Sequence, residues 1–405
     1  MTTPARTVYV DNNATTSVAP EVFEAMIPFF KDLYGNASSM HIFGGQVARH
    51  LDEARGKVAA LLNAQPEEIV FTSCGTESDN HAIRGVCEAH PEKRHIITTK
   101  VEHPAVLNVC RYMAKKGYRL TELPVDKQGN LDLDELAAAI TPETAIVSIM
   151  AANNETGTLF PIDRIAEICA EKGVIFHTDA VQAAGKIPLD MKKMPVSLLS
   201  ISGHKLHAPK GIGVLFIRRG TRISPFMLGG HQERNRRAGT ENAPYIVGLG
   251  KACEIAMNAM FEENNRVRQL RDRLERGLFE RIPYSHINGN PQWRLPNTTN
   301  IGFEFIEGEA ILLHLSAAGI AASSGSACTS GSLEPSHVLM AMQVPFTYAH
   351  GSVRFSLSRF NTDADVDHVL NVLPDIVSKL RSMSPFYADK LKELGRREQA
   401  AQGPV

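Results

Sequence analysis

Between residues 68 and 219 the chain alternates short apolar runs with amphipathic stretches, and this alternation is the feature that most restricts its fold. Six runs read as buried strands: Ile69–Thr72, His95–Thr99, Ala145–Met150, Val174–Thr178, Leu198–Ile201 and Gly213–Ile217. Helical patterns fill most of the gaps, for example at Leu133–Ile140 and Ile162–Lys172. Strands that alternate with helices form a mostly parallel sheet covered on both faces. Ligands of such sheets bind at the carboxyl ends of the strands, so the polar residues that follow each strand are the candidates for chemistry.

The composition narrows the class of protein further. The chain has 405 residues, and at about 150 residues per domain this length predicts two or three domains. Lys and Arg together number 43 and Asp and Glu 44, and the formal net charge of −1 argues against binding to nucleic acid or to a membrane surface. The six cysteines form no CxxC pair or zinc-ligand spacing, and no apolar run reaches the roughly 18 residues of a membrane-spanning helix. We therefore expect a cytoplasmic globular protein that holds no metal of its own, binds no nucleic acid and enters no membrane.

The second half of the chain predicts a linking helix and then a smaller set of strands and helices. Tyr245–Met260 has the composition of a buried helix and continues into Phe261–Ile282, where apolar residues recur at helical spacing. Beyond it we expect strands at Asn300–Ile306 and Ser352–Ser358, a helix at Glu309–Ala317 and a final helix. Thr362 and Asp365 form a capping box at the start of the final helix, and Pro374 is expected to kink or break it.

These patterns predict an α/β fold with two domains and a tail. The large domain is expected over residues 17–260, and a smaller α+β domain is expected to combine residues 1–16 with 261–384. The polar segment 385–405 is expected to be a flexible tail.

Two short segments that follow early strands are candidates for ligand binding. Gly75 and Thr76 lie where a strand runs into a helix, and the free N–H groups of a helix N-terminus suit a phosphate. His103 ends the next strand, directly before Pro104, which is suited to the first position of a helix. Taken alone, each feature is better explained as part of an ordinary strand–helix turn. Asn154 follows a third strand, and an Asn is also unremarkable in a turn.

An acid and a lysine at later strand ends are more informative. Asp179 ends an apolar strand, where a buried carboxylate requires a cationic partner. Lys205 lies between two apolar strands, where desolvation lowers the pKa of an amine and makes it a nucleophile toward aldehydes. Pyridoxal phosphate (PLP) needs a lysine for its Schiff base, an acid for its ring nitrogen and a phosphate cradle, and it benefits from a stacked aromatic ring. These groups are supplied by Lys205, by Asp179, by Gly75 and Thr76 with Ser202 and His204, and by His103.

Two features of the second half could serve a substrate. Cys328 is a single thiol among about ten small residues, and an exposed free cysteine is a liability unless its reactivity is used. The alternative is a flexible connector with an incidental cysteine. Arg354 and Arg359 lie five positions apart and would face opposite sides of a strand, so one of them can face the cleft and bind a carboxylate. The spacing does not choose between the two.

At these residues the chain resembles the cysteine desulfurases of the NifS/IscS type, in the class V aminotransferase group of PLP enzymes. The resemblance runs over about residues 7 to 386. It is carried by Tyr9-Val-Asp-Asn-Asn-Ala-Thr-Thr, Ser202-Gly-His-Lys, Arg237-Ala-Gly-Thr-Glu-Asn, Ser323-Ser-Gly-Ser-Ala-Cys-Thr-Ser and Val353-Arg-Phe-Ser-Leu-Ser-Arg-Phe. It implies the type I fold of PLP-dependent transferases, with a seven-stranded sheet in the large domain, a small domain and a homodimer.

The resemblance also implies a role for each candidate residue. For the cofactor, Lys205 would carry the Schiff base, Asp179 would pair with the ring nitrogen, Gln182 would bind the ring hydroxyl, and His103 would stack on the ring and act in catalysis. The phosphate would be held by Gly75, Thr76, Ser202 and His204, and by Thr240 of the neighbouring subunit. Asn154 would contact the cofactor and, together with Arg354, orient the substrate carboxylate. Cys328 would accept the sulfur.

The implied reaction converts L-cysteine to L-alanine and leaves the sulfur on Cys328 as a persulfide. The implied partner is an iron–sulfur scaffold protein of the NifU/IscU type, on which Cys328 could transiently ligate a cluster. A nearby cation such as protonated His103 is one way to activate the thiol. A selenocysteine lyase, another enzyme of class V or a non-catalytic sulfur carrier with the same fold are the alternatives.

Overall fold

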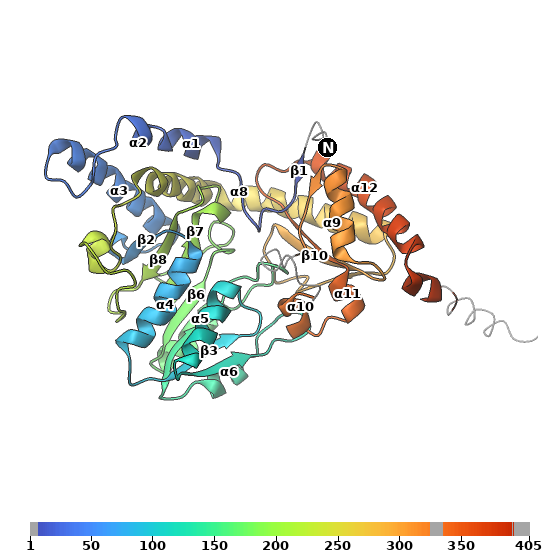
Figure 1. Ribbon diagram of the computed structural model, residues 1–405, viewed down its shortest axis with the longest axis horizontal. Helices are drawn as coiled ribbons and strands as arrows, with labels where there is room; N and C mark the ends of the chain where they lie inside the picture. Colours follow the sequence, from blue (N-terminus) through green and yellow to red (C-terminus); the bar gives the residue numbers. More distant parts are fainter. Residues whose placement is uncertain (1–6, 325–334, 391, 393–405) are drawn as a thin grey trace, which may run out of the picture.

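The centre of the structure is a seven-stranded sheet (Figure 1). The structure is a computed structural model that describes residues 7–324, 335–390 and 392. Across the sheet, the strands are β2 (Ile69–Thr72), β8 (Gly213–Ile217), β7 (Leu198–Ser202), β6 (Ile175–Asp179), β5 (Thr144–Ser148), β3 (His95–Thr99) and β4 (Arg119–Leu123). Only β8 runs antiparallel to its neighbours within this sheet, so the prediction of a mostly parallel seven-stranded sheet is confirmed.

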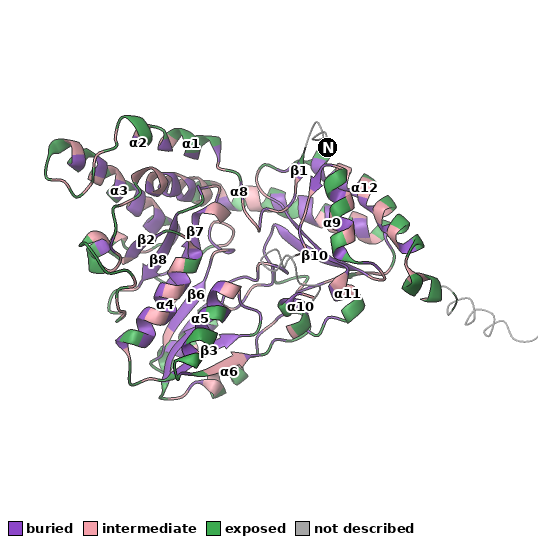
Figure 2. Cartoon of the chain, viewed as in Figure 1, coloured by how far each residue is buried: buried purple, intermediate pink, exposed green. Residues whose placement is uncertain are grey.

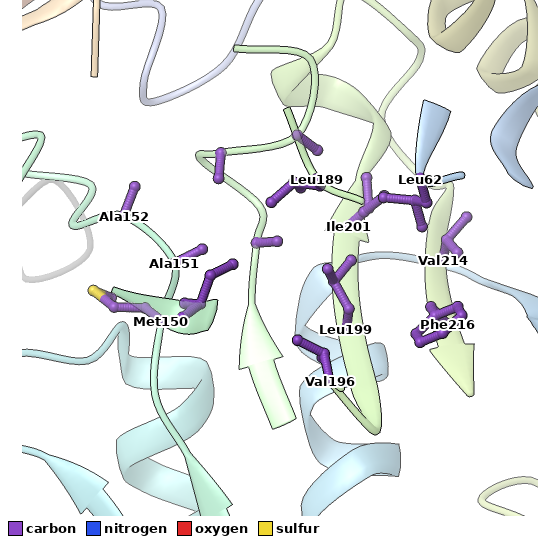
Figure 3. Packing of buried hydrophobic residues seen from close by; sticks show 14 of the residues in the cluster. Leu62, Met150, Ala151, Ala152, Leu189, Val196, Leu199, Ile201, Val214 and Phe216 are labelled. Atoms are coloured by element: carbon purple, nitrogen blue, oxygen red, sulfur yellow. The ribbon is translucent and has the colours of Figure 1, made fainter. Parts of the chain in front are cut away.

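Helices cover both faces of the sheet, as the apolar strands require. Successive side chains of a strand point to opposite faces, and Val70 packs in one hydrophobic cluster while Phe71 packs in another. The cluster that contains Val70 is completed by α4 (Gly75–Ala89) and α5 (Pro104–Lys115). The opposite cluster is completed by α1 (Pro20–Met26), α3 (Ile42–Leu61), α6 (Leu133–Ala139), α7 (Ile162–Glu171) and α8 (Ala243–Arg281). Leu199, Ile201, Val214 and Phe216 belong to this second cluster (Figure 3).

The two predicted halves of the linking helix are one continuous element, α8, of 39 residues. Leu249 in its first half packs in the core of the large sheet, and Leu270 and Leu274 in its second half pack in a separate core. In Figure 1 this helix runs from the large sheet toward the second group of strands and helices. We call the part around the seven-stranded sheet the large lobe and the part around the separate core the small lobe.

The small lobe is built on a three-stranded antiparallel sheet, β12-β10-β9. Its strands are β9 (Ser285–Ile287), β10 (Thr298–Phe303) and β12 (Ser352–Ser356), and a two-stranded parallel pair joins β1 (Val8–Tyr9) to β11 (Ile320–Ala321). The helices of this half are α9 (Gly308–Ala317), α10 (His337–Ala341), α11 (Phe346–His350) and α12 (Asp363–Ser382). Val338 and Leu339 of α10 pack instead in the core of the large lobe. The remaining short elements are α2 (Pro28–Lys31) and three 3₁₀ turns, η1 (Pro66–Glu68), η2 (Gly203–Lys205) and η3 (Gln232–Asn235).

The N-terminal segment belongs to the small-lobe core, since Val8 and Val10 are buried there. Figure 2 shows the same division as two buried interiors, with exposed residues mostly on the outer helix faces. The domain limits 17–260, 1–16 and 261–384 stay a prediction. Among the described residues, no helix is long and apolar enough to cross a membrane.

The described part of the C-terminal segment contacts the small lobe. Residues 385–390 have helical backbone, and the Tyr387 ring packs against Tyr284 and Phe305, at centroid distances of 6.3 and 5.6 Å. Within the predicted flexible tail, residues 391 and 393–405 lie outside the described residues. Cys328 also lies outside them.

Of the two outcomes predicted for Pro374, a kink or a break, the structure excludes the break. α12 begins at the predicted capping box and continues through Pro374 to Ser382. A proline inside a helix cannot donate to the carbonyl four residues earlier, here that of Leu370. That carbonyl oxygen instead accepts a hydrogen bond of 2.7 Å from Nη1 of Arg281, in the last turn of α8. The guanidinium therefore replaces the donor that the proline removes.

We expect Arg281→Ala to destabilise α12 by about 1 kcal/mol or more when Pro374 is present, because the Leu370 carbonyl then loses its donor. In a Pro374→Ala background the backbone N–H of residue 374 can bond to that carbonyl, so the same substitution should cost much less. Hydrogen exchange of the α12 amides in the wild type, both single variants and the double variant measures this coupling. Equal costs in the two backgrounds would contradict the compensation.

Candidate active site

A cavity of about 270 Å³ lies at the carboxyl ends of the central strands. It is bordered by the N-terminal ends of α4 and α5 and by Arg354 from β12. Ten of the predicted site residues line it: Gly75, Thr76, His103, Asn154, Asp179, Gln182, Ser202, His204, Lys205 and Arg354. Residues from distant parts of the chain therefore meet in one place, as the strand-end interpretation predicts.

Lys205 lies in η2, directly after β7, and its amine is held by backbone oxygens of the N-terminal segment. The Nζ atom donates to the carbonyl oxygens of Asn13 and Ala14, at 2.5 and 2.7 Å. Gln182 donates from Nε2 to the same Asn13 oxygen, at 3.0 Å. The N-terminal segment therefore fixes the amine within the cavity that also contains Asp179.

Asp179 is buried at the end of β6, and Oδ1 accepts a 2.9 Å hydrogen bond from the backbone N–H of Val181. Burial raises the pKa of this carboxyl to about 6, although the nearby charge of Lys205 lowers it. A second carboxyl, Asp79 on α4, lies on the same face of the sheet and is also buried. Burial, with the nearby Asp179, raises the pKa of Asp79 well above its usual range.

His177 lies two residues before Asp179 on β6 and is neutral. Burial lowers its pKa to about 3, and its two ring nitrogens pair with the hydroxyls of Ser148 and Ser200, at 2.8 and 2.9 Å. Its Nε2 lies 3.6 Å from Oδ1 of Asp79, but a neutral imidazole makes no ion pair there. The face of the sheet below the cavity therefore carries an uncharged histidine between hydroxyl groups.

His103 is the N-cap residue of α5, where Nδ1 accepts from the backbone N–H of Ala105 at 3.1 Å. Burial, together with the charge of Lys205, lowers the pKa of His103 to about 4. The imidazole is therefore neutral near pH 7 in this structure, and activation of a thiol by a protonated His103 stays a prediction. The neighbouring Glu102 is fully buried and accepts from Thr99 and from the backbone N–H of Met150.

The turn from β2 into α4, which is the predicted phosphate cradle, lines the cavity. A Cβ atom at Gly75 would lie 2.9 Å from Cγ2 of Val181 and 3.2 Å from Cβ of Ser202, so a larger residue would have to displace them. Within the described structure, the N-cap residue Cys74 makes no side-chain cap hydrogen bond. The first-turn N–H groups of α4 therefore remain available to an anion. His204 lies beside this turn, and burial lowers its pKa to about 4.

Arg354 and Asn154 also line the cavity. Arg354 is buried in β12 and donates from Nη1 to the backbone oxygen of Asn154, at 2.9 Å. Arg359 lies beyond the end of β12 and forms surface ion pairs with Glu21 and Glu263, so the structure favours Arg354 for the cavity. The predicted strand over 352–358 ends at Ser356, so the different surroundings of the two arginines do not come from alternation along one strand.

Two predicted residues are not in this cavity. Thr240 is exposed and lines a separate cavity of about 190 Å³ with Phe71 and Arg237. The loop that carries it is tied to the cradle, because Arg237 pairs with Glu77 in the first turn of α4, with Nε and Oε1 2.8 Å apart. Cys328 lies outside the described residues, and its position stays a prediction.

Three residues that line the cavity, Asn13, Ala14 and Asp79, have no role predicted from the sequence. Asn13 and Ala14 belong to a quoted motif, but their contact with Lys205 is made by backbone oxygens, which no side-chain pattern reveals. Asp79 follows Gly75 by four residues and therefore lies one helical turn farther along the same face of α4. That spacing could have indicated a second buried acid at the site.

The comparisons with known proteins agree with this geometry. The family described as "Aminotransferase class-V" matches residues 8–369. The chain belongs to the class-V aminotransferases. A cysteine desulfurase from Trichormus azollae is 60% identical over 97% of this chain and 98% of its own length. The cysteine desulfurase NifS of Azotobacter vinelandii is 57% identical over 94% of this chain and 95% of its own length. The solved structure of a NifS-like protein superposes with a TM-score of 0.87 at 42% identity, over 92% of this chain and all of that one. Within its family, this chain therefore groups with the NifS-type cysteine desulfurases.

The residues present fit PLP, the cofactor of this family. Oε1 of Gln182 is buried in the cavity wall and makes no hydrogen bond to any residue that the structure describes, so it can accept from a ligand hydroxyl. The cradle at Gly75 leaves room for an anion where a Cβ atom would collide. An amine, a carboxyl and an anion site thus surround a space of suitable size.

We expect Gly75→Ala to weaken PLP binding at least about tenfold, because the added methyl group displaces Val181 or Ser202 and disturbs hydrogen bonds to a charged group. Gly45→Ala in α3 is the matched control, since a Cβ atom there has no neighbour within 4 Å. Absorbance titration of the cofactor-free proteins with PLP measures both affinities. Wild-type affinity in Gly75→Ala would contradict the assignment of the cradle.

Glu102 predicts a pH-dependent stability. Burial raises its pKa from 4.5 to about 8, so the folded protein disfavours the ionised form. The stability that neutral Glu102 contributes is complete below about pH 4.5 and is lost as the pH rises to about 8. We therefore expect urea midpoints of Glu102→Gln to fall less than those of the wild type between pH 5 and pH 9. Parallel pH profiles for the two proteins would exclude this role.

Proposed function

We propose that this chain is a PLP-dependent cysteine desulfurase that converts L-cysteine to L-alanine. The sulfur is transferred to the thiol of Cys328, so one C–S bond of the substrate breaks and one S–S bond forms. L-cysteine plus the Cys328 thiol gives L-alanine plus the Cys328 persulfide, and no outside oxidant or reductant is needed. The cysteine desulfurase names of relatives that are 54–60% identical support this reaction.

The single observation that carries this proposal is the shared cavity of Lys205, Asp179, the Gly75 cradle and Arg354. When bound, PLP withdraws electrons from the α-carbon of an amino acid. Lys205 is the residue that we assign to the cofactor aldehyde, and its amine then takes the proton from the α-carbon of the substrate. Asp179 holds a proton at the ring nitrogen, since a carboxylate there favours the protonated ring.

The remaining residues bind and orient. Gln182 accepts from the ring hydroxyl, and His103 stacks on the ring as a neutral imidazole. The phosphate is bound by Gly75, Thr76, Ser202 and His204 of the same chain. Arg354 and Asn154 hold the substrate carboxylate at the far end of the cavity, which directs the substrate sulfur toward Cys328.

We further propose a homodimer and an iron–sulfur scaffold partner. Thr240 is exposed and lines a different cavity from Lys205, as expected of a residue that completes the phosphate site of a neighbouring subunit. The NifS relative supports delivery of the persulfide sulfur to a scaffold protein of the NifU/IscU type. The five described cysteines are all free thiols, which suits work in the reducing cytoplasm.

We expect Cys328→Ala to reduce alanine release from L-cysteine to near background while the visible absorbance of the bound cofactor persists. Lys205→Ala should lose both, because the amine that carries the cofactor is gone. Mass spectrometry after incubation with L-cysteine should find an added sulfur on the peptide that contains Cys328.

Cys74→Ala is the matched control, because this half-buried thiol lines the same cavity. It should still form the Cys328 adduct. Turnover of L-cysteine that survives Cys328→Ala would contradict the persulfide route. A protein without a chromophore after addition of PLP would favour the non-catalytic carrier instead.

A further inference from the structure

The Arg354 guanidinium makes two hydrogen bonds within the protein, and some of its N–H donors remain unused. Its Nη2 donates to Oδ1 of Asp11 at 2.7 Å, and its Nη1 donates to the backbone oxygen of Asn154 at 2.9 Å. The third nitrogen, Nε, is buried and has no hydrogen-bond partner among the described residues. A guanidinium carries five N–H donors in a fixed fork. These two contacts therefore leave donors for a ligand.

Asp11 reaches the guanidinium from outside the cavity. It follows β1 and forms an isolated β-bridge with Ser356, two residues beyond Arg354 on β12. Its side chain is 17% exposed, whereas that of Arg354 is 2% exposed. Arg354 lines the cavity, and Asp11 does not belong to its lining among the residues described. The contact of the Asp11 side chain with the cavity lining is therefore made through Arg354.

The contact has two physical effects on Arg354. A buried guanidinium without a counter-ion is costly, and the carboxylate of Asp11 balances that charge. An arginine side chain also has many rotamers, so anchoring one nitrogen lowers the entropy that must be lost when the remaining donors bind a ligand. Glu155, the other buried carboxyl that senses Arg354, is engaged by the Ser336 hydroxyl.

We propose that Asp11 is a positioning residue that gives this enzyme its preference for substrates with a carboxylate, because it fixes the Arg354 guanidinium with its remaining donors toward the cavity. This inference rests on the proposed function, in which Arg354 receives the substrate carboxylate. Asp11 touches neither substrate nor cofactor.

Two substitutions separate the anchor from the charge. Asp11→Ala removes both the hydrogen-bond acceptor and the negative charge. Asp11→Asn keeps an oxygen acceptor for Nη2 and removes only the charge, which opposes a second carboxylate near Arg354. Orientation is therefore lost in the first variant and kept in the second.

The test uses the holoenzyme and two ligands that differ only in the carboxylate, L-alanine and L-alaninamide. Changes in cofactor absorbance report the dissociation constant of each ligand. For Asp11→Ala we expect the dissociation constant of L-alanine to rise about tenfold and that of L-alaninamide to change less than about twofold. For Asp11→Asn we expect L-alanine to bind within about threefold of the wild type, or more tightly.

Glu275→Ala is the matched control for loss of a buried carboxylate–arginine pair. Glu275 pairs with Arg294 through two hydrogen bonds of 2.6 and 2.8 Å, and neither residue lines the cavity in the described structure. This variant should lower the thermal unfolding temperature without changing the ratio of the two dissociation constants.

Three outcomes would overturn the role of Asp11. They are an unchanged ratio in Asp11→Ala, equal weakening of both ligands in Asp11→Ala, and weakening of L-alanine in Asp11→Asn as large as in Asp11→Ala. If Asp11→Ala does not fold, weakening of L-alanine by about tenfold in Asp11→Asn is sufficient to overturn it. A wild-type enzyme that neither responds to L-alanine nor consumes L-cysteine would instead contradict the proposed function.

Discussion

The contact on which the site depends is the hydrogen bonding of the Lys205 amine to the backbone oxygens of Asn13 and Ala14. The same short segment reaches the other end of the cavity, because the Asn13 amide donates to the backbone oxygen of Asn154 at 3.1 Å. It also bonds to the small-lobe sheet, where the Asn13 amide donates to Oγ1 of Thr298 at 2.9 Å. Lys205 belongs to the large lobe and Arg354 to the small lobe, and one backbone segment is bonded to both sides of the cavity. Because Lys205 bonds to backbone oxygens, substitution of the Asn13 or Ala14 side chain does not remove these two acceptors.

Each of two cations at the cavity is matched by a carboxyl, and three histidines near it are neutral. Lys205 lies within the electrostatic reach of Asp179, and Arg354 forms an ion pair with Asp11. Burial lowers the pKa of His103, His177 and His204 to between about 3 and about 4. Unpaired charge is costly in a buried site, and burial keeps these three rings uncharged.

The sequence predicted the fold where burial dominates and failed where it does not. Strands covered on both faces read as apolar runs, and β2, β3 and β8 have the predicted limits. The edge strand β4 was missed, because only Leu123 of its five residues is buried and its pattern resembles a solvated segment. The strand-end rule found eight of the ten cavity residues for a similar physical reason, whereas Gln182 and the choice of Arg354 came from the family resemblance. It could not find Asp11 or Asn13, whose roles depend on contacts between segments that lie far apart in the chain.

The loop that carries Thr240 shows how the phosphate end is fixed. Glu233, Arg234 and Asn235 all have positive φ, which costs roughly 1–2 kcal/mol per residue for side chains larger than glycine. The buried Glu233 carboxylate makes two hydrogen bonds to Arg55, of 2.7 and 2.8 Å, and accepts from the backbone N–H of Phe71 on the edge strand β2. These bonds offset the strain and also close an open sheet edge. Arg237 in the same loop pairs with Glu77 of the cradle, and Glu233 pairs with Arg55 of α3, so the loop is joined both to the cradle and to α3. Thr240 thus has a fixed position relative to the cradle of its own chain, which the proposed role of Thr240 at the phosphate of a second subunit requires.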